Sequence, residues 1–401
     1  MSETPARPLS IFLVAAEESG DALGGALARA LVAHTRGAVS LQGVGGRAMA
    51  AAGIVSPFPI DELSIIGISE IPRRLPTILC RIRETADAVV AARPDALVII
   101  DSPDFTHRVA RRVRARAPSI PIVDYVSPSV WAWRPGRARA MRSYVDCVLA
   151  VLPFEPAEHL RLGGPPCVFV GHPLTEHLGN LRPNAEELER RGVDPPLVLV
   201  LPGSRSSEIR RLLAIFGAVI ARLGAKVGPA EFVLPTLPHL VAQIREGVAG
   251  WPLRPRIVID SAEKWAAFRT ARAALAASGT VTLELALAGV PMVAAYRIST
   301  IEAIIFRLQT TLQTVILTNL AIGENVVPEF LQWDCVPDRI GDALAPLLSD
   351  TPERRRQIEA FERLDQIMAL DTQPSVKAAA AVIDVARRGR SGIVAIEAPP
   401  I

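Results

Sequence analysis

Short apolar runs alternate with longer helical stretches along the whole 401-residue chain. Such runs, with helices between them, are typical of parallel sheets that are covered on both faces. They are Leu9–Ala15, Ala96–Ile100, Ile120–Tyr125, Cys147–Leu152, Cys167–Val170, Leu197–Leu201, Glu231–Leu234, Arg256–Ile259, Ala273–Ala277 and Met292–Tyr296. Because about five runs fall in each half of the chain, the sequence predicts an α/β protein of two doubly wound, Rossmann-like domains.

Chain length and composition also favour two domains. The chain is too long for one ordinary core, and 50% of its residues are apolar, so each half can bury its own interior. Pro183, Pro195 and Pro196 lie in a polar stretch, as in a linker. We expect an N-terminal domain over 1–185, a second domain over 195–350, charged and alanine-rich helices over 351–388, and a disordered tail over 389–401.

Several classes of protein are disfavoured by the composition. A net charge of +3 with scattered arginines argues against nucleic-acid binding. The four cysteines form no CxxC pair and the six histidines show no paired metal spacing, so we predict no metal and a reducing cytoplasm. The apolar run Leu9–Ala16 stops at Glu17 and lacks the flanks of a signal peptide. The apolar stretch 273–296 contains Glu284 and Pro291, so we expect strand, helix and strand instead of a membrane span.

Polar segments follow the predicted strands of the first half, where ligands bind in open parallel sheets. Glu17, Ser19 and Asp21 follow the first strand and can bond sugar hydroxyls; alternatively, Ser19 or Asp21 caps the next helix. Asp101 and Asp104 are candidates for a general base near the expected domain cleft. Asp101 is the better candidate because it comes first after its strand, whereas Asp104 can cap the helix that follows.

The segment VSPSVWAWR at 126–134 carries two of the five tryptophans in the chain. The indoles of Trp131 and Trp133 can stack on a sugar, and Ser127 can bond its hydroxyls. The alternative is that both indoles fill the core, and we favour a core position for at least one of them.

Two segments of the second half suit a diphosphate. Gly203, Ser204 and Arg205 follow a strand, open a helix and add a guanidinium, although a plain capped turn is the alternative. A second strand ends in Ser278, Gly279 and Thr280, which form another anion-binding turn. Glu284 lies one turn deeper on the same helix face, where it can hold a ribose or make an ordinary buried polar contact.

Read together, these segments resemble the lipid-A-disaccharide synthase family from Leu9 to about Arg388. The most specific are VSPSVWAWR at 126–134, LPGSR at 201–205 and SGT at 278–280 with Leu283-Glu284; DSPDF, GHPL and TNL…VPEFLQ agree. The resemblance implies a GT-B fold whose C-terminal helices can cross back to the N-terminal domain. It also implies an inverting, metal-independent transfer from UDP-2,3-diacylglucosamine to 2,3-diacylglucosamine 1-phosphate, with no cofactor.

The resemblance also implies roles for single residues. Asp101 is the expected base and Arg205 a ligand of the donor phosphates. The other expected donor-side residues are Gly203, Ser204, Ser278, Gly279, Thr280, Glu284, Asn319, Glu329 and Gln332; those on the acceptor side are Glu17, Ser19, Asp21 and Ser127. The chain departs from the family where Ala16 replaces a glycine and where the segment before Asn319 lacks its usual basic residues.

Acylated substrates lie in a membrane, so a family member needs an apolar docking surface. The expected contacts are Ile66, Ile68, Ile71, Leu75 and Leu79, with arginines beside them. The alternative is a helix packed on the sheet. We expect peripheral association with the cytoplasmic face of the inner membrane, and the resemblance is compatible with a homodimer.

Two other functions remain open from the sequence. One is another UDP-sugar enzyme of the same fold, such as an N-acetylglucosaminyl transferase or a 2-epimerase, which would not need the acyl-binding surface. The other is a non-catalytic nucleotide-sugar binding protein, which would not need Asp101.

Overall fold

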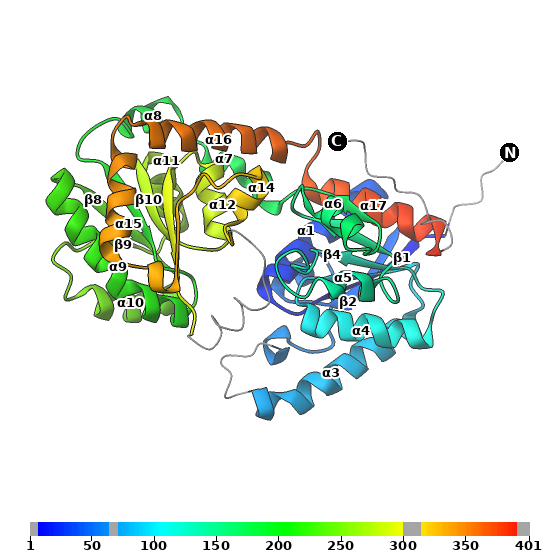
Figure 1. Ribbon diagram of the computed structural model, residues 1–401. Coiled ribbons are helices and arrows are strands. Elements are labelled where there is room, and N and C mark those ends of the chain that lie inside the picture. The colour runs from blue at the N-terminus through cyan, green and yellow to red at the C-terminus, as the bar shows by residue number, and fades with distance from the viewer. Residues whose placement is uncertain (1–6, 64–70, 300–313, 391–401) are drawn as a thin grey trace. The chain divides into compact units, whose positions relative to one another are not determined.

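The computed structural model describes residues 7–63, 71–299 and 314–390, and the chain divides into two compact units (Figure 1). Unit 1 comprises Met1–Glu176 and Leu370–Ile401, and unit 2 comprises His177–Ala369. Each unit contains one six-stranded sheet in which all paired strands are parallel. The prediction of an α/β fold with two doubly wound domains is confirmed.

The sheet of unit 1 has the strand order β2-β1-β3-β4-β5-β6. Its strands are β1 (Leu9–Ala15), β2 (Val39–Val44), β3 (Ala96–Ile100), β4 (Ile122–Tyr125), β5 (Cys147–Ala150) and β6 (Cys167–Phe169). All residues of β3, β4 and β5 are buried. Continuous aliphatic runs suit these positions because helices cover both faces of the sheet.

Helices α1 and α17 pack together on one face of this sheet, and α3 and α4 pack together on the other. The helices of unit 1 are α1 (Glu18–His34), α2 (Arg47–Ala51), α3 (Ile71–Ala92), α4 (Pro103–Arg116), α5 (Gly136–Met141), α6 (Glu155–Arg161) and α17 (Pro374–Arg388). Alternation along the strands supplies both faces: Leu97 and Ile99 join the core under α3 and α4, whereas Ile100 faces Gly24 of α1.

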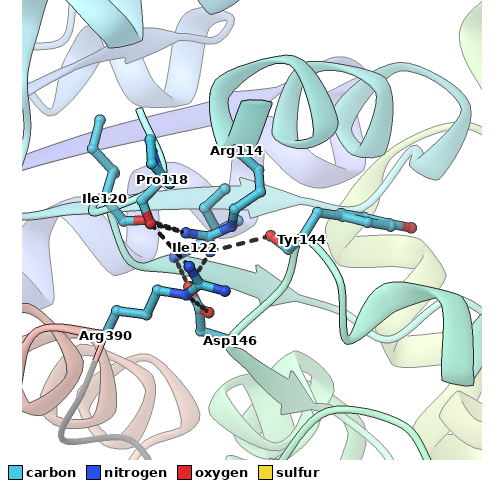
Figure 2. Close-up of polar contacts among 7 residues, drawn as sticks. All are labelled: Arg114, Pro118, Ile120, Ile122, Tyr144, Asp146 and Arg390. Atoms are coloured by element: carbon cyan, nitrogen blue, oxygen red, sulfur yellow. Dashed lines mark hydrogen bonds and ion pairs between the residues drawn. The ribbon is translucent and has the colours of Figure 1, made fainter. Parts of the chain in front are cut away.

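Ion pairs connect the end of the chain to the amino edge of this sheet (Figure 2). Arg390, just after α17, donates to Asp146 Oδ1 at 3.1 Å and to the Pro118 carbonyl at 3.2 Å. The buried Arg114 guanidinium of α4 pairs with the same Asp146 carboxylate. The last helix therefore belongs to the first unit, as the crossing back of the C-terminal helices requires.

The sheet of unit 2 has the order β12-β11-β10-β7-β8-β9. Its strands are β7 (Leu197–Leu201), β8 (Glu231–Pro235), β9 (Arg256–Val258), β10 (Ala273–Ala277), β11 (Met292–Tyr296) and β12 (Glu329–Leu331). Its helices are α7 (Leu178–Leu181), α8 (Ala185–Arg190), α9 (Ser206–Val227), α10 (Val241–Val248), α11 (Ser261–Thr270), α12 (Thr280–Leu287), α14 (Leu317–Ile322), α15 (Pro337–Leu344) and α16 (Pro352–Met368). Residues of α9, α10 and α15 share one core with the sheet, and α12, α14 and α16 form a second packed group.

The domain boundaries differ from those predicted. The stretch around residues 181–196 was expected to link the domains, yet α7 and α8 pack on α11 inside unit 2. Arg269 of α11 explains this, since its guanidinium donates to Glu187 Oε1 at 2.8 Å and to the Asn180 carbonyl at 2.9 Å. The helices predicted as one block over 351–388 are also divided, with α16 in unit 2 and α17 in unit 1. Most of the predicted tail, from residue 391 on, lies outside the described residues.

The apolar stretch 273–296 forms β10, α12 and β11, as predicted. Among the described residues, no helix combines the length and the apolar character needed to cross a bilayer.

Candidate active site

The strand order of unit 1 changes direction between β1 and β3, because β2 lies on one side of β1 and the later strands lie on the other. In such sheets, ligands bind beyond the carboxyl ends of the strands at this point. Ser19 lies in the first turn of α1, which follows β1, and Asp101 directly follows β3. Their side chains meet there, since Ser19 Oγ donates to Asp101 Oδ2 at 3.2 Å.

Strained backbone holds Asp101 in place. Asp101 and Ser102 have φ of +54° and +45°, in the left-handed region that few residues other than glycine adopt. The Asp101 N–H donates to the Tyr125 carbonyl at 3.0 Å, and Thr106 Oγ1 donates to the Asp101 carbonyl at 2.6 Å. The Ser102 hydroxyl is buried without a hydrogen-bond partner among the described residues. Strain of this kind gathers at functional sites, which favours Asp101 over the exposed Asp104.

The loop after β4 begins with the same strain. Val126 has φ of +77°, which is a true outlier for a β-branched residue. Its N–H donates to the Leu149 carbonyl of β5 at 3.0 Å. Because β3 pairs with β4, this loop starts beside Asp101.

Helix α6 holds this loop through two buried side chains, Glu155 and His159. The Glu155 carboxylate accepts from Trp131 Nε1 at 3.2 Å, and also from the N–H groups of Val151 and Leu152. One turn later, His159 Nε2 lies 2.7 Å from Ser127 Oγ. Burial raises the pKa of Glu155 to about 7, although these N–H groups oppose the shift, and burial lowers the pKa of His159. Sequence reasoning missed Glu155 and His159 because nothing in their local pattern links them to a loop.

Ser127 and the tryptophans therefore have defined positions. Ser127 is buried and engaged with His159, so the predicted contact with an acceptor hydroxyl would compete with this bond. Trp131 is partly buried against Phe154, whereas Trp133 is 39% exposed. Neither indole is among the buried core residues, so the preference for a core position of at least one of them is not confirmed.

The structure gives Asp21 a different role from the one expected. Its carboxylate accepts from the N–H groups of Gly46, Ala48 and Met49 at 2.7, 2.8 and 3.0 Å, at the start of α2. Asp21 is buried and caps α2, because three unpaired backbone donors need an acceptor there. Glu17 is exposed at the start of α1 and makes no capping bond there.

In unit 2 the strand order changes direction between β7 and β10. The loop Gly203–Arg205 follows β7, and Ser278–Thr280 follows the neighbouring β10, so the two predicted phosphate segments lie at one point of the sheet edge. Gly203 has φ of +116°, and a Cβ there would lie 2.5 Å from a Glu208 carboxylate oxygen, so this turn requires glycine.

The turn after β7 differs from the open anion-binding turn that the sequence predicted. The carboxylate of Glu208 accepts from the N–H groups of Ser204 and Arg205 at 3.1 and 3.2 Å. It also accepts from Tyr296 Oη at 3.1 Å and pairs with the Arg205 guanidinium at 3.2 Å. A side-chain carboxylate thus takes the backbone donors expected for phosphate. The signal was present in the sequence, since Glu208 is three residues after Arg205, the spacing of a capping box.

The Arg205 side chain itself stays available at the surface, with 76% of it exposed. Ser278 and Gly279 are partly exposed, Thr280 is exposed, and a Cβ at Gly279 would meet no atom within 4 Å. These groups leave open space at the start of α12, as an anion site requires.

Glu284 makes an ion pair that the sequence did not predict. Its Oε2 lies 3.3 Å from Lys264 Nζ, which also lies 4.1 Å from the centre of the Trp265 ring. No pattern in the sequence joins these residues, because they come from α11 and α12. A ribose at Glu284 would share the carboxylate with Lys264.

Asn319 bonds the backbone of a neighbouring turn. It is buried in α14, its Oδ1 accepts from the N–H groups of Val326 and Val327 at 3.1 and 2.9 Å, and its Nδ2 donates to the Val327 carbonyl at 3.0 Å. Both polar atoms of its side chain hold the turn before β12, so the predicted donor contact would compete with these bonds.

Glu329 and Gln332 also bond backbone. Both carboxylate oxygens of Glu329 lie 3.2 Å from the Val315 N–H, and burial raises the pKa of Glu329. With its amide oriented to match its neighbours, the Gln332 side chain donates to the Ile298 carbonyl and accepts from the Ile298 N–H, at 3.3 and 3.2 Å. Gln332 has φ of +51° and brings the ends of β11 and β12 together.

The predicted acyl contacts are described only in part. Ile66 and Ile68 lie outside the described residues. Ile71 begins α3, and its side chain is not described. Leu75 and Leu79, one turn apart on α3, are 42% and 39% exposed.

Comparison with known proteins decides the family. A family model described as lipid-A-disaccharide synthetase matches residues 11–383. The lipid-A-disaccharide synthase of Bradyrhizobium diazoefficiens is 61% identical over 381 residues, covering 95% of this chain and 97% of the relative. That of Rhodospirillum centenum is 43% identical, covering 94% and 95%. The chain belongs to the lipid-A-disaccharide synthase family. The predicted family and its glycosyltransferase activity are thereby confirmed.

Solved structures agree on the fold. MurG of Acinetobacter baumannii superposes with a TM-score of 0.55 at 16% identity, covering 94% of this chain and 100% of that one. UDP-GlcNAc 2-epimerase of Neisseria meningitidis, bound to UDP-GlcNAc, gives 0.54 at 12% identity, covering 94% and 98%. At these identities the likeness shows the fold alone. It is the GT-B fold expected of a lipid-A-disaccharide synthase.

Proposed function

We propose that the chain joins UDP-2,3-diacylglucosamine to 2,3-diacylglucosamine 1-phosphate, with inversion and without a metal, to give the lipid A disaccharide 1-phosphate and UDP. The observation that carries this proposal is Asp101, held by left-handed backbone at the switch point of unit 1 and bonded to Ser19. Membership of the lipid-A-disaccharide synthase family supplies the substrates.

Asp101 is the proposed general base. The 6-hydroxyl of the acceptor attacks the anomeric carbon of the donor while the bond from that carbon to UDP breaks. The hydroxyl proton passes to the Asp101 carboxylate, which the Ser19 hydrogen bond orients. A positioned base of this kind contributes about 10²- to 10⁴-fold to the rate.

The departing UDP needs positive charge, and we propose that unit 2 supplies it. The exposed Arg205 guanidinium is a fork that matches phosphate oxygens, and the start of α12 adds the positive end of a helix. These groups stabilise the developing charge without a metal ion.

The test compares Asp101→Asn with Asp104→Asn. Asparagine keeps the shape of aspartate and tolerates left-handed backbone, so Asp101→Asn removes the base and leaves the turn intact. We expect kcat for UDP release to fall at least about 100-fold while UDP binding is retained. Asp104→Asn is the matched control, because Asp104 is exposed three residues later, and it should behave as wild type. Equal turnover of the two variants would remove Asp101 from the mechanism.

Access to acylated substrates is the last part of the proposal. We propose that the chain associates with the cytoplasmic face of the inner membrane, as a monomer or homodimer, and that Leu75 and Leu79 contribute to this contact. Their exposure on α3 supports it. Leu75→Ser with Leu79→Ser should reduce co-sedimentation with vesicles, whereas Leu160→Ser should not, although Leu160 of α6 is 81% exposed. Equal binding of all variants would contradict the α3 contact.

A further inference from the structure

Three guanidinium groups gather around two aromatic rings on unit 1. The Arg134 guanidinium lies 4.4 Å from the centre of the Trp133 ring, and that of Arg137 lies 5.9 Å from the same centre. The Arg111 guanidinium of α4 lies 4.7 Å from the centre of the Tyr144 ring and donates to its hydroxyl at 3.3 Å. All three distances fall within the range of cation–π contacts.

These three arginines have no ion pair with a carboxylate among the described residues. The buried Asp124 carboxylate pairs with His107 instead, since its Oδ2 lies 3.2 Å from His107 Nε2. The other ring nitrogen of His107 lies 3.0 Å from the Tyr144 hydroxyl, so the ring under Arg111 is held firmly. Arg134 and Arg137 bring two like charges to one ring, and an anion brought between them would relieve their repulsion.

Part of this cluster lies in the loop after β4. Trp133 and Arg134 belong to the loop that starts with Val126 at the end of β4. The end of β4 is bonded to Asp101, whose N–H donates to the Tyr125 carbonyl. Arg134 has φ of +53°, so the backbone is also strained where it presents this guanidinium. Trp133 and Arg134 therefore belong to the loop that starts beside the proposed base, whereas Tyr144 lies just before β5.

We propose that Arg111, Arg134 and Arg137, with the exposed face of Trp133, bind a sugar phosphate, namely the phosphate monoester of the acceptor. Guanidinium forks match the oxygens of a phosphate, and an indole face packs on a pyranose ring. This inference rests on the proposed function and deepens it. A glucosamine phosphorylated at C1 carries its anion on a different carbon from the reacting 6-hydroxyl, so the anion requires a cationic site apart from the base.

The test compares two double variants with the same loss of charge. Arg134→Ala with Arg137→Ala removes two members of the cluster. Arg139→Ala with Arg142→Ala is the matched control, because these arginines are exposed on and next to α5 but contact neither ring. The probes are a short-chain 2,3-diacylglucosamine 1-phosphate, the same acceptor without its phosphate, and phosphatidylglycerol vesicles.

We expect the first variant to raise the KM for the phosphorylated acceptor by about tenfold or more, with an unchanged KM for the donor. It should also lose most of the preference of the wild type for the phosphorylated acceptor, while the control keeps it. Unchanged thermal unfolding confirms that the variants are folded. If both double variants lower vesicle binding equally and leave the acceptor KM unchanged, the arginines serve lipid headgroups and the proposal is wrong.

A calorimetric titration with glucosamine 1-phosphate separates this proposal from the proposed function. We expect heat of binding with the wild type and the control variant, and its loss with Arg134→Ala and Arg137→Ala. A wild type that binds this ligand but forms no disaccharide would contradict the proposed reaction alone. Identical titrations of the two double variants would overturn the phosphate site alone.

Discussion

The carboxyl edges of the two sheets hold their loops in different ways. In unit 1 the turns are made by Asp101, Ser102 and Val126 in left-handed conformation. In unit 2 the turn after β7 is made by Gly203, and the buried Glu208 carboxylate satisfies the N–H groups of the loop.

This difference separates two ways of preparing a site. Left-handed residues other than glycine cost free energy, of the order of 1–3 kcal/mol each, and persist only when the surroundings enforce them. The edge of unit 1 is thus less stable than a relaxed backbone would make it, and its strained turns fix the orientation of the Asp101 carboxylate. The turn after β7 in unit 2 instead places its positive φ at a glycine, Gly203, and relies on satisfied hydrogen bonds. Removing a side chain should therefore have opposite effects on stability at the two edges.

The largest expected effect is in unit 2. Asn319→Ala removes the partner of the Val326 and Val327 backbone groups, and buried unsatisfied groups cost roughly 1–3 kcal/mol each. We expect the free energy of unfolding to fall by about 4 kcal/mol, measured by urea denaturation. UDP affinity below the melting transition should be retained. A loss of UDP affinity with unchanged stability would support Asn319 as a donor ligand.

The next largest effect is expected in unit 1, where the folding stability depends on pH. The pKa of Glu155 rises from 4.5 in the unfolded chain to about 7 in the folded protein because of burial. The folded state therefore holds the proton more tightly, and stability from this group is present below about pH 4.5 and lost as the pH rises through about 7. The free energy of unfolding lost over this pH range is about 3 kcal/mol.

Glu155→Gln isolates this dependence. The difference in unfolding free energy between wild type and variant, measured from pH 5 to about 8, should shift against the wild type as the pH rises. The lowered pKa of His159 acts in the opposite direction, with stability lost as the pH falls, but it is common to both proteins. A difference that stays constant with pH would show that Glu155 is ionised throughout.

A smaller effect of opposite sign is expected at Ser102. Ser102→Gly relieves the left-handed strain and removes a buried hydroxyl without a described partner, at the cost of a more flexible unfolded chain. We expect a gain of about 1 kcal/mol in thermal unfolding and a lower kcat, because Asp101 is held less firmly. Ser119→Gly, at an exposed position with ordinary φ, should bring no gain. A Ser102→Gly variant less stable than the wild type would contradict this difference between the two edges.

The smallest effect is expected at the opposite edge of the unit 1 sheet. Arg390→Ala removes an ion pair whose arginine is 44% exposed, which is worth about 0.5 kcal/mol. UDP release should not change, since this edge carries none of the candidate site. A clear loss of turnover would mean that the return of α17 shapes the carboxyl edge.

Much of the fold could be predicted from the sequence because fully buried strands are continuous aliphatic runs. β1, β3, β7, β10 and β11 have the predicted bounds. The strands β2 and β12 were not among the predicted runs. β2 alternates partly buried and exposed residues over most of its length, and β12 has only three residues. Edge strands bury less surface, so the apolar signal is weaker there.

The candidate site was predictable in place but only partly in detail. Asp101, Ser19 and Arg205 were expected at strand ends, and they lie at the switch points of the two sheets. Asp21, Asn319 and Glu208 are polar residues of the same motifs, yet their side chains bond the backbone of neighbouring turns. A motif does not distinguish a side chain that binds a ligand from one that holds the loop.

The sequence by itself determined the α/β class, the family and the strand ends at which chemistry is possible, because hydrophobic periodicity and motif spacing are local properties. Only the tertiary structure decided which polar side chains remain free. That depends on donors contributed by distant segments, as with the Lys264 ammonium at Glu284 or the Trp131 indole N–H at Glu155. It also placed the Arg111 guanidinium of α4 over the Tyr144 ring, which no spacing in the chain indicates.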